Sequence, residues 1–328
     1  MMAGIMLILM STAKLGTVIR FIPTPVIMGF TAGIGVTIWV GQWPYFFGFP
    51  SLPYVEHFHE KLWLMIQSLP YSDIPTLCIS IFSLILLLVL PKIQYINKVP
   101  APIMAMVIAT FIQGYYQFPT VQTIGTAFGG IPQGLPEFSF PSLSLDKIFS
   151  LMGPAFTIAM LGAIESLLSA VVADGMSGQK HESNTELFGQ GLANIFAPLF
   201  GGIAATGAIA RTATNIRQGG TSPLAGIVHA ITLGAILLFL APYAVYIPLA
   251  SMAAILFVVS YNMSDAPRFI RMIRLAPKAD QTILILTFFL TIFTDLVVAV
   301  NVGVVLAVLQ FMRKMIETVD VHEVSCKE

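Results

Sequence analysis

The stretch Gly201-Gly-Ile-Ala-Ala-Thr-Gly-Ala-Ile-Ala-Arg-Thr-Ala-Thr-Asn-Ile-Arg-Gln-Gly-Gly220 is the most informative part of this sequence about its fold. Its small, flexible residues do not suit a continuous membrane-spanning helix, but they do suit an extended segment that leads into a short helix. The helical part, about Ala210 to Gln218, would be only about 13 Å long, under half of the roughly 30 Å hydrocarbon core of a bilayer. We therefore predict a strand-plus-half-helix element at 201–218, which places Arg211 at membrane depth.

A second stretch, Pro154-Ala-Phe-Thr-Ile-Ala-Met-Leu-Gly-Ala-Ile-Glu-Ser-Leu-Leu-Ser-Ala-Val-Val172, contains one ionisable residue, Glu165. A charged side chain at the centre of a membrane helix costs roughly 2.5–3.5 kcal/mol on insertion scales, so it is normally retained for a pathway, a coupling ion or a buried partner. The structural alternatives are a static ion pair or a protonated carboxyl for Glu165. For Arg211 the alternative is a partner such as Glu165 or a backbone carbonyl.

The composition predicts an all-α polytopic membrane protein. The 328 residues are 56% hydrophobic and only 10% charged, whereas a soluble domain carries about 25% charged residues. The net charge of zero argues against nucleic-acid binding. Cys78 and Cys326 cannot form a metal site of any usual spacing, and no His/Asp/Cys constellation lies in or beside the helices. We expect no enzymatic activity, no catalytic residues, no metal and no cofactor.

Hydropathy predicts ten apolar segments, at 1–13, 23–41, 74–90, 101–117, 151–173, 185–199, 222–241, 246–261, 280–295 and 298–315. The element at 201–218 makes an eleventh. The first run is too short to span a bilayer, so we expect the chain to begin in the middle of a helix.

The basic residues predict the orientation, because cytoplasmic connections are enriched in Lys and Arg. Lys61 and Lys147 fall on one side of the predicted membrane. The other side, which includes the tail, carries Lys14, Arg20, Lys92, Lys98, Lys180, Arg217, Arg268, Arg271, Arg274, Lys278, Arg313, Lys314 and Lys327. The tail is therefore predicted to be cytoplasmic, and the connections 42–73 and 118–150 to be external.

The start of the predicted half-helix is a candidate anion site. The first amide groups of a helix are unpaired, and the helix dipole adds partial positive charge there. We predict that Gly207, Ala208, Ile209 and Ala210 present these amides to a substrate oxyanion, and that Arg211 adds a full positive charge.

Several motifs of the chain resemble the SulP family of anion transporters: Gly162-Ala-Ile-Glu-Ser-Leu-Leu-Ser-Ala170, Glu186-Leu-Phe-Gly-Gln-Gly-Leu-Ala-Asn194, Phe200-Gly-Gly202, Ala210-Arg-Thr-Ala-Thr-Asn-Ile-Arg217 and Ile22-Pro-Thr-Pro-Val-Ile-Met-Gly-Phe-Thr-Ala-Gly33. The match runs in collinear order along nearly the whole chain. The resemblance implies fourteen membrane elements in two inverted repeats of seven, with a core domain that carries substrate past a gate domain. Counted from the C-terminus, this chain would hold elements four to fourteen. It would lack the first three, with the partner half-helix, and the STAS domain.

The resemblance also implies a domain division. Residues 1–21 would be a remnant of the first-repeat core, and 22–117 the gate helices of that repeat. The external loop 118–150 would lead to the second-repeat core at 151–241, which holds the substrate and coupling site. The gate helices of the second repeat would occupy 246–316, and a cytoplasmic tail at 317–328 would lead toward the STAS domain.

Individual positions match the family pattern. Glu165 matches the acidic position of the eighth helix, Ser169 the hydroxyl one turn later, and Arg211 the basic position beside the anion site. In the sodium-coupled bicarbonate branch the acidic position resembles Asp, and a Thr stands in place of Ile209. Glu165 with Ile209 is more similar to the proton-coupled branch, which carries sulfate or C4-dicarboxylates. We therefore assign proton coupling, rather than sodium coupling, to Glu165 and Ser169.

The sequence thus predicts a secondary active transporter of a small anion, with sulfate first, by proton symport with alternating access. We expect it to be a homodimer in the bilayer of the inner (plasma) membrane. The alternatives are transport of C4-dicarboxylates or bicarbonate, an anion channel, and a truncated fragment that does not transport.

Overall fold

The computed structural model describes residues 1–19, 24–50, 52–53, 55, 57–93, 99–132, 134, 136–141, 144–217, 219–294, 298, 302 and 305–306. Within these ranges the regular secondary structure is helical, and the one isolated β-bridge joins Thr123 and Pro248. The all-α prediction is therefore confirmed. The predicted tail at 317–328 lies outside the described residues, as do most of the apolar segment 298–315 and the basic residues Arg20, Lys98, Arg313, Lys314 and Lys327.

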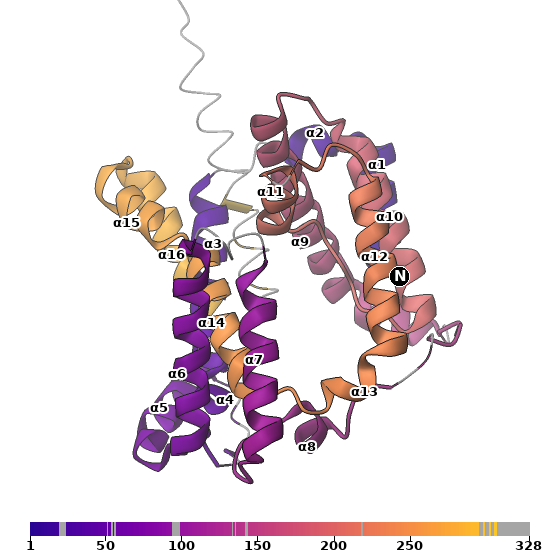
Figure 1. The fold of residues 1–328 in the computed structure, drawn as a ribbon. Helices are drawn as coiled ribbons and strands as arrows, with labels where there is room; N and C mark the ends of the chain where they lie inside the picture. The colour runs from indigo at the N-terminus through magenta and orange to yellow at the C-terminus, as the bar shows by residue number, and fades with distance from the viewer. Residues whose placement is uncertain are drawn as a thin grey trace, which may run out of the picture. The chain divides into compact units, whose positions relative to one another are not determined.

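Sixteen α-helices and three short 3-10 helices follow one another along the described chain (Figure 1). The α-helices are α1 Met2–Thr12, α2 Gly16–Ile19, α3 Thr24–Gly41, α4 Trp43–Phe47, α5 Phe58–Ser68, α6 Ile74–Val89, α7 Ala101–Tyr116, α8 Ile124–Phe128, α9 Leu145–Ser177, α10 Ser183–Phe196, α11 Ile209–Arg217, α12 Leu224–Phe239, α13 Ala241–Ala244, α14 Leu249–Ser264, α15 Ala266–Leu275 and α16 Lys278–Phe293. The 3-10 helices are η1 Leu69–Tyr71, η2 Leu90–Lys92 and η3 Ala197–Phe200.

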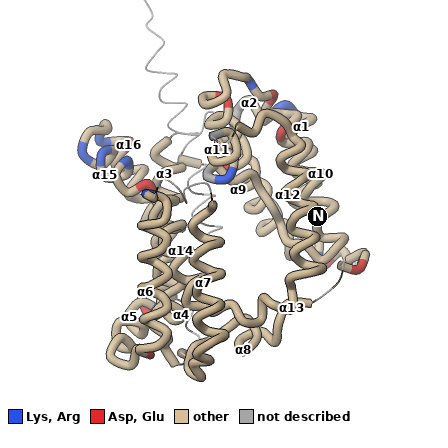
Figure 2. Tube along the Cα trace, in the orientation of Figure 1, with Lys and Arg blue, Asp and Glu red and all other residues tan. Residues whose placement is uncertain are grey.

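Four helical stretches of the described chain are long and apolar enough to cross a membrane: Thr24–Phe47, Ile74–Lys92, Leu145–Ser177 and Leu249–Leu275. Shorter apolar helices occupy Met2–Thr12, Ala101–Tyr116 and Leu224–Phe239. Figure 2 shows that α6, α7 and α12 carry no charged residue along their length. This pattern agrees with a polytopic membrane protein.

Helix α9 begins at Leu145, earlier than the predicted start at 151. The Ser144 hydroxyl caps it by accepting a hydrogen bond from the Lys147 amide at 3.3 Å, and Asp146 in the first turn complements the helix dipole. The predicted external loop 118–150 is also not all loop, because it contains α8 and the first residues of α9. Capping residues on the polar side of the apolar run extend the helix beyond the hydropathy window.

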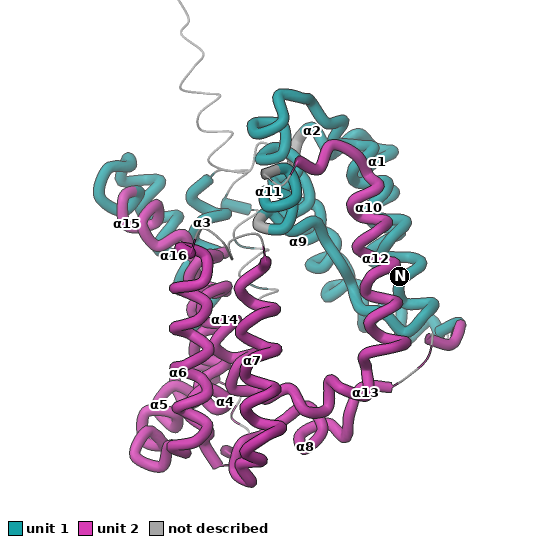
Figure 3. The backbone as a smooth tube through the Cα atoms, in the orientation of Figure 1, with its two compact units in different colours: residues 1–30, 139–217, 272–328 teal, residues 31–138, 218–271 magenta. Residues whose placement is uncertain are grey.

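The chain divides into two compact units (Figure 3). Unit 1 contains residues 1–30, 139–217 and 272–328, and unit 2 contains residues 31–138 and 218–271. Each unit therefore combines segments that are far apart in the sequence.

In unit 1, α1 packs on α9 and α10 around a cluster of small and branched residues. The buried members are Ala3, Leu7, Ala159, Ala163, Leu167 and Leu187. Gly4 and Gly191 lie at the crossing of α1 and α10, where a Cβ on Gly4 would come within 2.6 Å of the Gly191 carbonyl oxygen. Small residues at such crossings allow the two backbones to approach closely.

In unit 2, the core lies where α4, α6, α7 and α14 meet. Its buried residues are Phe46, Leu87, Leu90, Ala101, Ala105, Ala253 and Ala254. The rings of Phe46 and Phe257 stack at 4.3 Å between centroids. The buried Ser80 hydroxyl donates to the Phe46 carbonyl oxygen at 2.8 Å, so that this polar group is satisfied inside the core.

Candidate functional site

The half-helix predicted within 201–218 is present as α11, Ile209–Arg217, nine residues or about 14 Å long. Residues 202–208, which lead into it, have no regular secondary structure, so the strand part of the prediction is not formed. A strand needs a neighbouring backbone as its hydrogen-bond partner. Here the main chain at Ala205 is bonded to side chains instead.

Asn194, on α10, holds this lead-in segment. Its Nδ2 donates to the Ala205 carbonyl oxygen at 2.8 Å, and its Oδ1 accepts from the Ala205 amide at 2.9 Å. Gln190, one turn earlier on α10, also donates through Nε2 to the Ala205 carbonyl oxygen. Because Asn194 is only 3% exposed, its side chain is fixed by packing, and α10 thereby sets the position of Ala205.

The next residues of the segment lie against α9. The Thr206 hydroxyl donates to the Gly162 carbonyl oxygen at 3.0 Å. At Gly207 an added Cβ would lie 3.3 Å from Cα and Oγ of Ser166 and 3.6 Å from Cβ of Ser169. The chain therefore passes close to α9 just before α11 begins, and a larger residue than glycine would press on Ser166.

Ser169 joins α9 directly to α11. Its hydroxyl donates to the Thr212 Oγ1 at 2.8 Å, and it is 4% exposed. Ser166, one turn earlier, donates to the Glu186 Oε1 on α10 at 2.8 Å. The two hydroxyls thus connect α9 to α11 and to α10.

The start of α11 keeps unused backbone donors. The Ala208 carbonyl oxygen accepts from the Thr212 amide at 2.9 Å, which is the first turn of the helix. Within the described chain, the amides of Ile209 and Arg211 have no hydrogen-bond acceptor. Such amides, together with the helix dipole, favour an anion at this end of α11. The side chain of Ala210 lies outside what the structure describes.

A Glu165–Arg211 ion pair, one of the structural alternatives, is not formed in the described structure. Among the described residues no salt bridge joins them. Glu165 is partly buried on α9, one turn before Ser169, whereas Arg211 is exposed in the first turn of α11. The structure therefore brings Ser169 to residues 207–212, but it does not bring the Glu165 carboxylate to the Arg211 guanidinium.

Asn194, Thr206 and Thr212 are structurally important residues that the sequence analysis did not assign. Asn194 ends the Glu186–Asn194 motif and is a buried amide in a predicted apolar segment, which was a usable signal. Thr206 and Thr212 gave no such signal. Among the described residues no three His, Cys, Asp or Glu side chains gather as a metal site would require.

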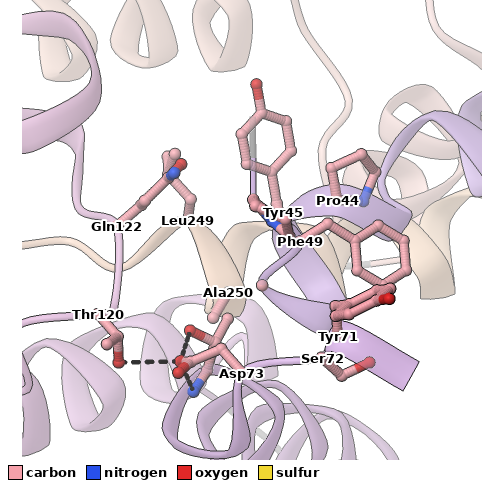
Figure 4. A pocket seen from close by; sticks show the side chains of 13 residues that line it. Pro44, Tyr45, Phe49, Tyr71, Ser72, Asp73, Thr120, Gln122, Leu249 and Ala250 are labelled. Carbon is pink, nitrogen blue, oxygen red and sulfur yellow. Dashed lines mark hydrogen bonds between the residues drawn. The ribbon is translucent and has the colours of Figure 1, made fainter. Parts of the chain in front are cut away.

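A cavity of about 430 Å³ lies in unit 2, and none of the predicted site residues lines it. Its polar wall is Asp73, whose Oδ2 accepts from the Thr76 hydroxyl at 2.6 Å, the Thr76 amide at 3.0 Å and the Thr120 hydroxyl at 3.0 Å (Figure 4). Partial desolvation acts to raise the pKa of Asp73, but these hydrogen bonds outweigh it and lower the pKa. A carboxylate charged at neutral pH repels anions, which disfavours this cavity as an anion site.

Comparisons with known proteins agree with the predicted family. A model of the sulfate permease family matches residues 1–287. The Bacillus subtilis (strain 168) protein named "Putative sulfate transporter YvdB" is 47% identical over 321 residues, which are 98% of this chain and 60% of that protein. The bicarbonate transporter BicA of Picosynechococcus sp. is 33% identical over 96% of this chain and 55% of its own length. The chain thus spans between half and two thirds of these relatives.

Solved structures show the same fold. The transmembrane domain of a cyanobacterial BicA matches with a TM-score of 0.74 and 29% identity, covering 94% of this chain and 74% of that one. A structure of SLC26A9 matches with a TM-score of 0.84 over 95% of this chain and 50% of that one, at 22% identity. These similarities support the polytopic membrane fold.

Proposed function

This chain belongs to the sulfate permease family, and from that premise we propose that it forms the anion-binding part of a secondary transporter. The substrate is a small oxyanion, for which sulfate is the first candidate, and it is carried by proton symport with alternating access. The observation that carries the proposal is the start of α11, where free amides lie next to the exposed Arg211 and the preceding residues 205–206 are bonded to α10 and α9.

The chemistry of that end of α11 suits a tetrahedral oxyanion. The amides of Ile209 and Arg211 supply directed donors, and the helix dipole supplies partial positive charge without a desolvated ion. The Arg211 guanidinium adds a planar fork of donors, which binds oxyanions bidentately. Gly207, Ala208 and Ala210 contribute backbone rather than side chains, so that an anion can come close to the main chain.

Sulfate is proposed ahead of bicarbonate for two reasons. The more similar of the two compared relatives carries a sulfate transporter name, at 47% against 33% identity. The pattern of Glu165 with Ile209 resembles the proton-coupled branch of the family, not the sodium-coupled bicarbonate branch.

We assign proton coupling to Glu165 and a supporting role to Ser169. Glu165 is partly buried on α9 and has no ion-pair partner in the described chain, so its carboxyl is available to gain and lose a proton. Ser169 links the turn after Glu165 to Thr212 of α11. A change in protonation one turn away is thereby connected, through a single hydrogen bond, to the helix that binds the anion.

We propose the domain organisation, orientation and oligomeric state from the same family membership. Residues 1–21 and 151–241 belong to core domains, residues 22–117 and 246–316 to gate domains, and 118–150 to an external connection. The C-terminus faces the cytoplasm from the inner (plasma) membrane, because the basic residues favour that side. The transporter is a homodimer.

The test is sulfate uptake by proteoliposomes under an imposed inward pH gradient. Glu165→Gln mimics the protonated carboxyl, so we expect it to bind and exchange sulfate but to lose accumulation driven by the pH gradient. Asp146→Asn is the matched control, because it removes an exposed carboxylate from the same helix. Accumulation by Glu165→Gln at the wild-type level would refute the coupling role, and uptake that only equilibrates in the wild type would indicate a channel.

A further inference from the structure

We propose that α15 lies at the cytoplasmic surface of the bilayer and binds the headgroups of anionic phospholipids. The proposal goes beyond anion transport and does not depend on which anion is carried. It rests on three features of α15: its basic and apolar residues lie on different sides, its basic side chains are exposed, and backbone breaks bound the helix.

Helix α15 is set apart from its neighbours by backbone breaks. Asp265, between α14 and α15, has a left-handed backbone with φ 40° and ψ 50°, which ends the preceding helix. Pro277 precedes α16 at the other end. Leu249–Leu275 satisfies the length and hydropathy of a span as one stretch, but the break at Asp265 means that α15 is a separate helix of ten residues, about 15 Å long.

Basic and apolar residues lie on different sides of α15. Arg268, Arg271 and Arg274 recur every three positions, so they share one side of the helix. Phe269, Ile270 and Ile273 lie on the other side, at spacings of three and four. A basic side opposite an apolar side is the pattern of helices that lie in the membrane interface.

The basic side is exposed and uncompensated. All three arginines are exposed, and no residue of α15 is buried. In the described part of the chain no salt bridge joins any of these arginines to a carboxylate. Figure 2 shows these basic residues gathered on α15. Ile270, on the apolar side, is exposed as well, at 48%.

This combination fits a lipid surface better than water or an acidic protein. Arginine forks match phosphate oxygens bidentately, and each basic residue near an anionic leaflet adds to the electrostatic attraction. The exposed Ile270 side chain gains by insertion at the acyl boundary, whereas an acidic protein surface would leave it unmatched. The predicted topology places this connection on the cytoplasmic side, where anionic lipids attract basic segments.

The test uses the reconstituted protein with an environment-sensitive fluorophore on Ile270→Cys, in a background where Cys78 and Cys326 are Ser. Vesicles contain phosphatidylcholine with a minority of phosphatidylglycerol, and one of the two lipids is brominated so that it quenches nearby fluorophores. We expect brominated phosphatidylglycerol to quench about tenfold more per molecule than brominated phosphatidylcholine at low salt, and the preference to fall as salt screens the charges.

The variant Arg268→Gln, Arg271→Gln and Arg274→Gln should reduce this preference to within about twofold. The matched control removes three exposed charges elsewhere on the same predicted face, as Lys14→Gln, Lys92→Gln and Lys180→Gln, and should keep the preference. Equal quenching by the two lipids in the wild type, or an unchanged preference in the arginine variant, would overturn the proposal. So would a fluorophore that neither brominated lipid reaches, because protein would then cover this surface.

Discussion

Replacing Asn194 by Leu should loosen the segment that leads into α11 and weaken anion binding without any change at the anion site itself. Leu has the same branching and the same number of side-chain heavy atoms, so the substitution leaves no cavity, but it removes every hydrogen bond of the amide. Those bonds run from Nδ2 to the Ala205 carbonyl oxygen at 2.8 Å and the Gln190 carbonyl oxygen at 2.9 Å, and from the Ala205 amide to Oδ1 at 2.9 Å.

The magnitude follows from these bonds. Each contributes about 0.5–1.5 kcal/mol net, or about 1.5–4.5 kcal/mol for the three. Two considerations favour the lower half of that range. Ala205 is exposed, so its freed backbone groups can bond to water, and Gln190 lies one turn before Asn194 within α10, where its carbonyl oxygen also serves the helix. We expect a loss of about 2 kcal/mol in the free energy of unfolding.

The assay pairs denaturant unfolding in detergent micelles with calorimetric titration of sulfate. If the whole loss of about 2 kcal/mol destabilises the anion-binding conformation at the start of α11, sulfate binding weakens by up to about 30-fold. Asn215→Leu is the matched control: Asn215 is exposed on α11, and a surface change there should cost less than about 0.5 kcal/mol. Unfolding and sulfate affinity at the wild-type level in Asn194→Leu would refute the clamping role of Asn194.

Three further predictions concern single groups. Arg211→Ala should weaken sulfate binding more than Arg211→Lys, because Lys keeps the charge but loses the planar fork; equal affinities in calorimetry would return Arg211 to a structural role. A double-mutant cycle of Ser169→Ala and Thr212→Val should give a coupling energy of about 1 kcal/mol in unfolding, since the two hydroxyls share one hydrogen bond at 2.8 Å; a coupling near zero would mean that the bond contributes nothing. Glu182 caps α10, and hydrogen bonds from the Thr185 hydroxyl and amide and from Asn184 lower its pKa from 4.5 to about 2. Because the folded pKa is depressed, the stabilisation by Glu182 is complete above pH 4.5 and is lost as the pH falls toward 2. Glu182→Ala should therefore flatten acid unfolding followed by circular dichroism in that window, and an unchanged profile would contradict the capping role.

The short helix at 201–218 could be predicted because its evidence is local. Glycine, alanine and threonine in that stretch disfavour a full span, and the observed α11 starts one residue before the predicted Ala210 and ends one before Gln218. The start of α9 was predicted too late, because hydropathy responds to the apolar run and not to the cap at Ser144. Local composition thus predicts which elements exist, while capping residues decide where they begin.

The contacts that hold the site could not be predicted in the same way. The bonds from Asn194 to Ala205 and from Ser169 to Thr212 join residues 11 and 43 positions apart, and their pairing depends on how α9, α10 and α11 pack. The expected strand does not form for a related reason. The Asn194 side chain of α10 is hydrogen-bonded to the Ala205 amide and carbonyl, which a strand would pair with a neighbouring backbone. Helix α15 was treated as a basic connection, although arginines at every third position already indicated a helical face.

The five hydrogen bonds that tie residues 205–212 to α9 and α10 limit how the anion site can move. Asn194 and Gln190 together make three of them to Ala205, Thr206 makes one to Gly162, and Ser169 makes one to Thr212. At about 0.5–1.5 kcal/mol each, undocking α11 alone would cost about 2.5–7.5 kcal/mol, so an undocked state would be populated at about 1% or far less. All of these bonds lie within unit 1. The start of α11 therefore moves together with α9 and α10, and a bound anion would travel with these three helices as one body.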